Sequence, residues 1–177
     1  SQIGHQAPLV RPRVSERFDF EGEIALVIGK GGRDIAEADA YDHVFGYSCY
    51  NDGSVRDWQF HTSQWTPGKN FAGTGAFGPW LVTPDELGPS ERLKLETRLN
   101  GQTMQSAHVD EMIFSIPQQI AYLSTIVDLE PGDVIVTGTP GGVGVKREPP
   151  VFMKPGDVCE VEVSGIGILS NPVVMQD

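Results

Sequence analysis

The sequence has few cysteines and no long apolar run. Its two cysteines, Cys49 and Cys159, lie far apart, too few for the disulfide framework of a small secreted domain. Both stand in strand-like surroundings, where we expect buried free thiols. No apolar stretch approaches the roughly 20 residues that span a bilayer, and the N-terminal residues show no apolar core of a signal peptide. We therefore expect a cytoplasmic protein without a membrane partner.

Positive charge is also scarce. The chain has 13 Lys and Arg residues against 24 Asp and Glu residues, a formal net charge of -11. Nucleic acids and anionic membranes would be repelled by such a protein, so neither is expected as a partner. With 177 residues, the chain is long enough for one domain with a substantial hydrophobic core.

What the sequence does contain is glycine and proline, which separate short apolar runs as in a β-rich protein. Asn100-Gly101 predicts a two-residue hairpin turn. A single well-formed helix is predicted after Ser115, which can cap it, with an apolar stripe of Ile116, Ile120, Leu123 and Val127. A shorter helix is expected over Ile35–His43. The predicted strands are Glu23–Ile28, Val44–Cys49, Gly78–Val82, Lys94–Leu99, Thr103–Ala107, Asp133–Thr137, Val158–Val163 and Ile166–Ser170.

These elements predict a mainly β fold. We expect a mixed, mainly antiparallel β-sandwich or roll with one well-formed helix, formed as a single domain over residues 1–177. No linker, low-complexity tract or solenoid repeat divides the chain.

Two glutamates, Glu21 and Glu23, stand at the entrance of the strand-like run Ile24–Ile28. Side chains alternate along a strand, so both carboxylates point to the same face. They repel each other unless water, protons or a cation intervene. Asp52, which ends a second strand-like run, supplies a third carboxylate. Three carboxylates with open positions suit Mg²⁺ or Mn²⁺ better than Zn²⁺; the alternative is solvated strand-end charges and an aspartate that caps a turn.

Four segments, in this order, resemble the fumarylacetoacetate hydrolase family: FEGEIALVIGK, GYSCYNDGSVRDWQ, PGKNFAGTGAFGPWLVT and VIVTGTPGGVG. The resemblance extends from about Phe18 to Val173. It implies the fold of this family's C-terminal catalytic domain. It also implies that Glu21, Glu23 and Asp52 bind Mg²⁺, with Mn²⁺ or Ca²⁺ as other candidate ions.

The same resemblance implies catalytic and substrate-binding roles for Arg56, Gln59, Lys69 and Thr139. A guanidinium at Arg56 can fix a carboxylate; the alternative is a surface pair with Asp57. Lys69 matches the active-site lysine, which would stabilise developing enolate charge. The hydroxyl of Thr139 and nearby backbone N–H groups would hold a substrate carboxylate, unless this glycine loop is only a tight turn.

The activity implied by the resemblance is Mg²⁺-dependent hydrolysis of a C–C bond in a small acylpyruvate or β-diketo acid, through an enolate that the metal stabilises. Breakdown of aromatic compounds is the setting suggested by analogy. Two alternatives stay open: an isomerase, hydratase or oxaloacetate-type decarboxylase on the same scaffold, or a truncated domain that binds metal without catalysis. The expected partners are a small 2-oxo acid and a second copy in a homodimer.

Hydrolysis needs a base that activates water, and here the sequence departs from the pattern. Hydrolytic members carry a His–Glu pair on a segment before the paired glutamates. His5 and Glu16 occupy that region, but their surroundings do not match, so we do not assign them this role. We expect that the N-terminal part of the family's full-length protein is absent from this chain.

Overall fold

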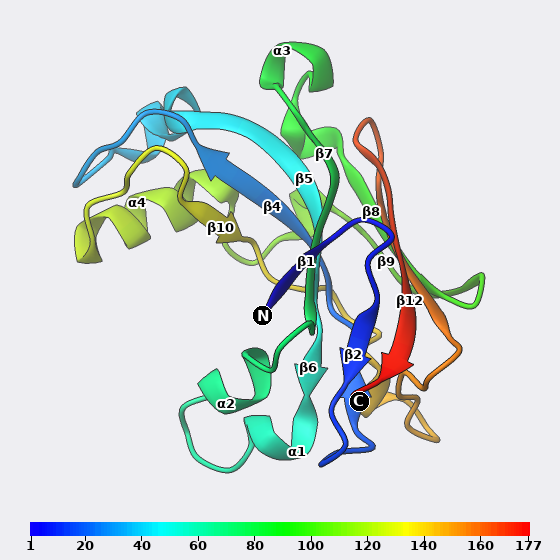
Figure 1. Cartoon of the computed structure of the whole chain (residues 1–177). Coiled ribbons are helices and arrows are strands. Elements are labelled where there is room, and N and C mark those ends of the chain that lie inside the picture. Colours follow the sequence, from blue (N-terminus) through cyan, green and yellow to red (C-terminus); the bar gives the residue numbers. More distant parts are fainter.

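Two five-stranded sheets form the body of the protein in the computed structural model, which describes residues 1–177 (Figure 1). The first sheet has the order β1-β7-β5-β4-β10 and the second the order β2-β12-β11-β8-β9. The strands of the first are β1 (Gln2–Gly4), β7 (Gly75–Val82), β5 (Val44–Asp52), β4 (Gly22–Ile28) and β10 (Val134–Val136). Those of the second are β2 (Leu9–Arg11), β12 (Gly167–Met175), β11 (Val158–Val163), β8 (Lys94–Leu99) and β9 (Gln102–His108).

Shorter elements connect the sheets. Strands β3 (Phe18–Asp19) and β6 (Ser54–Val55) form a two-stranded ribbon. The α-helices are α1 (Arg56–Gln59), α2 (Thr66–Lys69), α3 (Pro84–Leu87) and α4 (Ile116–Ile126). The 3₁₀-helices are η1 (Glu37–His43), η2 (Ser90–Arg92), η3 (Val109–Glu111) and η4 (Gly144–Lys146).

The predicted mixed and mainly antiparallel β architecture is confirmed. Only β1 with β7 and β2 with β12 pair in parallel, and the other neighbours are antiparallel. The hairpin between β8 and β9 turns at Asn100 and Gly101, whose φ angles are 52° and 77°. Both positive values are what a type I′ turn requires. Asn100 and Gly101 were therefore sufficient to predict this turn from the sequence.

Helix α4 begins as the sequence predicts. The hydroxyl of Ser115 accepts a hydrogen bond from the Gln118 backbone N–H, and the Gln118 side chain accepts one from the Ser115 N–H. This reciprocal pair satisfies two backbone donors that the helix cannot pair itself. Val127 was wrongly placed in the apolar stripe: it follows the end of the helix and is 49% exposed.

Other boundaries differ from the prediction. Residues Glu37–His43 form a 3₁₀-helix rather than the expected α-helix over Ile35–His43. Strand β12 runs on to Met175, well beyond the predicted end at Ser170, because it pairs with β11 and then with β2. Strands β1, β2, β3 and β6 are not predictable from the sequence, because they are two or three residues long and carry no periodic pattern of their own.

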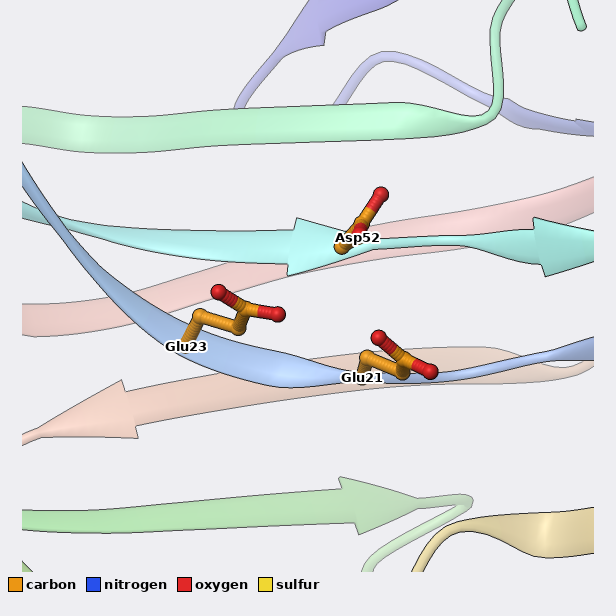
Figure 2. Close-up of side chains that lie close together, drawn as sticks. All are labelled: Glu21, Glu23 and Asp52. Atoms are coloured by element: carbon orange, nitrogen blue, oxygen red, sulfur yellow. The ribbon is translucent and has the colours of Figure 1, made fainter. Parts of the chain in front are cut away.

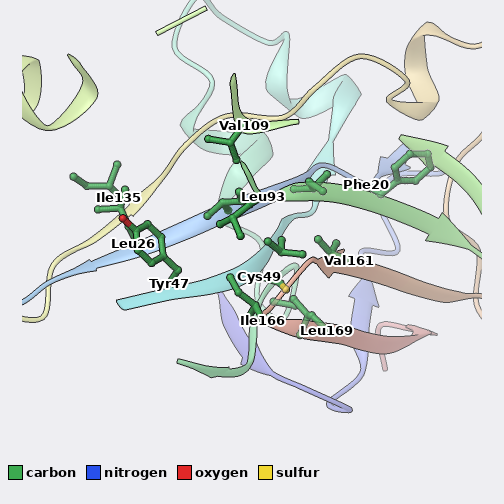
Figure 3. Packing of buried hydrophobic residues seen from close by; sticks show 14 of the residues in the cluster. Phe20, Leu26, Tyr47, Cys49, Leu93, Val109, Ile135, Val161, Ile166 and Leu169 are labelled. Carbon is green, nitrogen blue, oxygen red and sulfur yellow. The ribbon is translucent and has the colours of Figure 1, made fainter. Parts of the chain in front are cut away.

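The hydrophobic core lies between the two sheets (Figure 3). Cys49 of β5 packs there with Val161 of β11 and Leu169 of β12. Along β4 the even-numbered residues, such as Ile24 and Leu26, face this core. The odd-numbered residues therefore point to the opposite, outer face of the first sheet.

Both cysteines are free and buried, as expected. Burial raises the pKa of each thiol to about 12. No helix of the structure has the length and apolar character needed to cross a membrane.

Candidate metal centre

Three carboxylates meet on the outer face of the first sheet. Antiparallel pairing aligns Gly22 of β4 with Asn51 of β5, and the Asp52 backbone N–H donates to the carbonyl of Glu21 at 2.9 Å. This register brings the side chain of Asp52 beside those of Glu21 and Glu23 (Figure 2). One oxygen from each carboxylate lies within 4.8 Å of the others. The predicted acidic cluster of Glu21, Glu23 and Asp52 is thus assembled by strand register.

The acidic cluster is largely removed from water. Glu21 is 8% exposed and Glu23 is 3% exposed. Burial, followed by the negative charge of Asp52, raises the pKa of Glu23 to about 8. Burial also raises the pKa of Asp52, although the Lys69 ammonium opposes this shift. Without a further positive charge, the protein therefore holds these carboxylates at an energetic cost.

Lys69 lies directly against the acidic cluster. Helix α2 carries it, and its Nζ lies 2.7 Å from a carboxylate oxygen of Glu21 and 2.7 Å from one of Asp52. An ammonium group has three N–H donors, so one donor is left for another acceptor. The sequence-predicted lysine is therefore in place to act on a molecule bound beside the carboxylates.

Arg56 is buried next to the same cluster. Its Nη1 is ion-paired with Glu21 and donates to the Gln59 side-chain oxygen at 2.9 Å, while its Nε donates to Asp19 at 2.8 Å. Burial alone would lower the pKa of Arg56, but Glu21 and Asp19 together raise it. The alternative surface pair with Asp57 is wrong. Helix α1 carries both Arg56 and Gln59, and their side chains are hydrogen-bonded to each other.

Asp19 is a residue of this site that the sequence analysis missed. Its side chain is fully buried and accepts hydrogen bonds from the backbone N–H groups of Phe20, Gly144 and Val145 and from Arg56. Asp19 thereby fixes the guanidinium that reaches Glu21. A signal was present: Asp19 continues the two-residue spacing of Glu21 and Glu23 by one further step.

Thr139 lies behind the acidic cluster rather than in it. Its hydroxyl donates to the Gly22 carbonyl at 3.0 Å and accepts from the Gln105 side-chain amide at 2.8 Å. The same loop supplies the Gly138 N–H, which donates to a carboxylate oxygen of Glu23 at 2.7 Å. The hydroxyl of Thr139 therefore fixes the backbone at Gly22, and the Gly138 N–H contacts the carboxylate of Glu23, a predicted metal ligand.

The donor set fits a hard divalent cation. All three predicted ligands are carboxylates, the type of oxygen donor that Mg²⁺, Mn²⁺ and Ca²⁺ prefer. None of the four histidines forms a hydrogen bond with the acidic cluster. His5 accepts instead from the Ser170 N–H, and Glu16 is exposed. The structure thus gives no support to His5 and Glu16 as a water-activating pair.

A cavity of about 580 Å³ lies near the acidic cluster but is not lined by it. It is lined by Ile24, by the loop residues Thr137–Gly141 and by His108, but by none of the three carboxylates. Gly138 lines this cavity and also donates its N–H to Glu23, so the cavity adjoins the acidic cluster.

Comparison with proteins of known sequence gives a family and close relatives. The family described as "Fumarylacetoacetate (FAA) hydrolase C-terminal" matches residues 1–174. The oxaloacetate tautomerase YisK of Bacillus subtilis (strain 168) is 48% identical over 160 residues, 90% of this chain and 53% of that protein. The mitochondrial oxaloacetate tautomerase fahd2 of Xenopus laevis is 46% identical over 176 residues, 98% of this chain and 55% of that protein. The chain thus spans about half the length of these relatives.

Solved structures agree with the fold. A fumarylacetoacetate hydrolase from Exiguobacterium antarcticum has a TM-score of 0.95 and 40% identity, with 99% of this chain and 64% of that chain covered. A fumarylpyruvate hydrolase from Pseudomonas aeruginosa, solved with Mn²⁺ and pyruvate, has a TM-score of 0.90 and 30% identity, with 99% and 75% covered. The second comparison shows that a protein of this fold binds a divalent cation.

Several finer expectations stay predictions. The relatives do not establish Mg²⁺ as the ion of this chain, a homodimer or a role in the breakdown of aromatic compounds. One relative is mitochondrial and another is bacterial, so a cytoplasmic location also stays a prediction. The order of the two enzymatic interpretations does change: the relatives favour the isomerase alternative over C–C hydrolysis.

Proposed function

The chain belongs to the fumarylacetoacetate hydrolase family, and on that premise we propose that it catalyses the keto–enol tautomerisation of a small 2-oxo dicarboxylic acid such as oxaloacetate, with a divalent cation. Two relatives that are 48% and 46% identical bear the name oxaloacetate tautomerase. This choice replaces C–C hydrolysis, which the motifs alone put first. Because the chain spans about half of those proteins, the activity is proposed for the domain described here.

The observation that carries the proposal is the position of the Lys69 ammonium. Its Nζ donates to Glu21 and to Asp52 at 2.7 Å each, and an ammonium has three N–H donors, so one is left for a substrate oxygen. The Lys69 side chain is 19% exposed, so a molecule bound beside the carboxylates can reach it. An oxo group whose oxygen gains negative charge is a suitable acceptor for this donor.

Tautomerisation needs little beyond this arrangement. In the keto-to-enol direction, water takes the C3 proton, a C2–C3 double bond forms and the C2 oxygen gains a proton from solvent. One proton leaves and one arrives, so neither water nor a redox partner is consumed. A divalent cation held by Glu21, Glu23 and Asp52 would supply Lewis-acid stabilisation of negative charge on oxygen.

The chain's own residues act on orientation and charge. Arg56, fixed by Asp19 and Gln59, holds the Glu21 carboxylate through its Nη1. Lys69 donates a hydrogen bond to the C2 oxygen as negative charge develops there. The Gly138 N–H orients Glu23, so one loop fixes the position of a ligand.

The test is the rate at which enol-oxaloacetate decays to the keto form, followed by enol absorbance with Mg²⁺ or Mn²⁺ present. Lys69→Met should lower kcat by about 10²- to 10³-fold, as for loss of one donor to a developing oxyanion. Lys30→Met is the matched control, because Lys30 is exposed and makes no ion pair. Its rate should equal that of the wild type.

Hydrolysis is the second candidate, favoured by the likeness to the fumarylpyruvate hydrolase. Acetylpyruvate incubated with the same protein distinguishes the two, because hydrolysis releases acetate and pyruvate. Pyruvate formation from oxaloacetate is measured in parallel, since it reports decarboxylation. Cleavage of acetylpyruvate, together with an unaccelerated tautomerisation of oxaloacetate, would replace the proposed function by the hydrolytic one.

A further inference from the structure

The backbone between the two glutamate ligands is held by side chains. Gly22 separates Glu21 from Glu23, and its N–H donates to the side-chain oxygen of Gln105 at 3.0 Å. Its carbonyl accepts from the hydroxyl of Thr139 at 3.0 Å. Both polar groups of this one peptide position are therefore satisfied by residues that approach from outside β4.

Gln105 closes these contacts into a ring. Its side-chain nitrogen donates to the Thr139 hydroxyl at 2.8 Å and to the Pro140 carbonyl at 2.9 Å. The orientation of the amide is fixed, because the Pro140 carbonyl can only accept and the Gly22 N–H can only donate. Gln105 is 1% exposed, so these contacts are shielded from water.

The ring ties the metal centre to the second sheet. Gln105 belongs to β9 of the second sheet, whereas Glu21 and Glu23 lie at β4 of the first. The loop that Gln105 holds at Thr139 and Pro140 also carries the Gly138 N–H, which donates to Glu23. One amide thus fixes the backbone between the two ligands and the donor that orients the second ligand.

We propose that Gln105 is a positioning residue of the metal centre, which sets the spacing of Glu21 and Glu23 and the orientation of the Glu23 carboxylate. Gln105 touches none of the three carboxylates itself. It acts through Gly22 and through the loop Gly138–Pro140. This inference rests on the part of the proposed function that assigns a divalent cation to the acidic cluster.

Loss of the Gln105 amide should weaken both the contact with Gly22 and the contact with the loop Gly138–Pro140. Gln105→Met keeps the length of the side chain and removes its polar atoms, which leaves the Gly22 N–H and the Pro140 carbonyl unsatisfied. Partners that orient metal ligands typically change metal affinity by about 10- to 100-fold when they are removed. We expect a loss of this size in Mn²⁺ affinity.

The experiment measures the Kd for Mn²⁺ by titration calorimetry, with no substrate present. The matched control is Asn171→Leu. Asn171 is also a buried amide of the second sheet and donates to the carbonyls of Gly4 and Ala7 at 2.8 Å each. Both variants lose a buried amide, but only Gln105→Met loses one that reaches the metal centre. Thr139→Val, which breaks the ring at another bond, is measured as well.

The expected result is a Kd raised about 10-fold or more in Gln105→Met, a raised Kd in Thr139→Val and an unchanged Kd in Asn171→Leu. If Gln105→Met does not fold, the Thr139→Val value decides. Equal Kd values in the wild type and the ring variants, equal losses in all three variants, or no Mn²⁺ binding by the wild type would each overturn the inference. A raised Kd with no tautomerase activity in the wild type would support the inference and reject the proposed function.

Discussion

At the scale of single residues, the surroundings of Glu23 show that this carboxylate needs a proton or a cation. Its carboxylate is buried, faces the negative charge of Asp52 and receives a hydrogen bond from Gly138. Burial, followed by the charge of Asp52, raises its pKa from 4.5 to about 8, although the hydrogen bond from Gly138 opposes this shift. Protons would therefore compete with the proposed divalent cation for the same group near neutral pH.

This competition predicts how the stability of the metal-free protein depends on pH. The folded state binds a proton at Glu23 up to about pH 8, whereas the unfolded chain releases it near 4.5. Stability from this group is therefore complete below about 4.5 and is lost as pH rises toward 8 and beyond. Relative to Glu23→Gln, the wild-type Tm should fall across this range, as measured by calorimetry in a chelator.

Excess Mn²⁺ is the control for that measurement. An ion at the carboxylates removes the need for the proton, so the wild-type Tm should rise with Mn²⁺, and more at pH 8 than at pH 5. Glu23→Gln should respond weakly to the ion at either pH. Parallel pH profiles of the two metal-free proteins would contradict the shifted pKa of Glu23.

At the scale of elements, β4 depends on the absence of a side chain at Gly22. A Cβ at this position would lie 1.9 Å from the hydroxyl oxygen of Thr97 on β8, far inside van der Waals contact. Gly22→Ala should therefore destabilise the protein by about 1–3 kcal/mol through overpacking. The free energy of unfolding in urea measures this cost.

A second glycine offers the comparison. A Cβ at Gly4 of β1 would meet nothing within 4 Å, so Gly4→Ala should leave the free energy of unfolding within about 0.5 kcal/mol of the wild type. Thr97→Ala combined with Gly22→Ala should recover part of the loss. An unaltered stability of Gly22→Ala would show that the two sheets separate more easily there than the structure implies.

Elements with a strong local pattern were predictable from the sequence. The alternation in β8 and β11 and the capped, amphipathic α4 are properties of the residues themselves. The short strands β1 and β2 are different. Each has three residues, and each becomes a strand only because a longer strand, β7 or β12, lies beside it. Such pairing is set by tertiary structure and leaves no local trace.

The candidate site divides in the same way. The carboxylates were predicted from their positions on two strand-like runs, and they, Arg56 and Lys69 lie in motifs that resemble a family. The structure brings these residues together. Gln105 was missed because it is one polar residue in a strand, and its role arises from the packing of two sheets. Thr139 was found, but its hydroxyl is occupied by Gly22 and Gln105, which no spacing rule indicates.

At the scale of the whole molecule, several large apolar side chains are left in contact with solvent. Ile113 is 90% exposed and Phe114 is 67% exposed, in the segment that leads into α4. Neighbouring exposed apolar residues of this kind are typical of association surfaces. The homodimer implied by the family resemblance therefore stays our prediction for this chain.

Light scattering after size exclusion tests that prediction. A dimer would give twice the chain mass of 19.2 kDa, and dilution should not dissociate it if the interface is of ordinary size. A mass of about one chain at all concentrations would contradict it. The measurement needs no assumption about activity, so it is independent of the proposed tautomerase function.

The alternation of side chains along β4 also decides which mutations the protein tolerates. Successive residues of β4 face opposite sides of the sheet. Glu23 points outward, beside the carboxylates of Glu21 and Asp52, while Ile24 points inward to the core. A single inserted or deleted residue would exchange the two sets, placing a glutamate among apolar side chains and an isoleucine at the site. Substitutions along this strand are therefore expected to be tolerated more readily than the insertion or deletion of one residue.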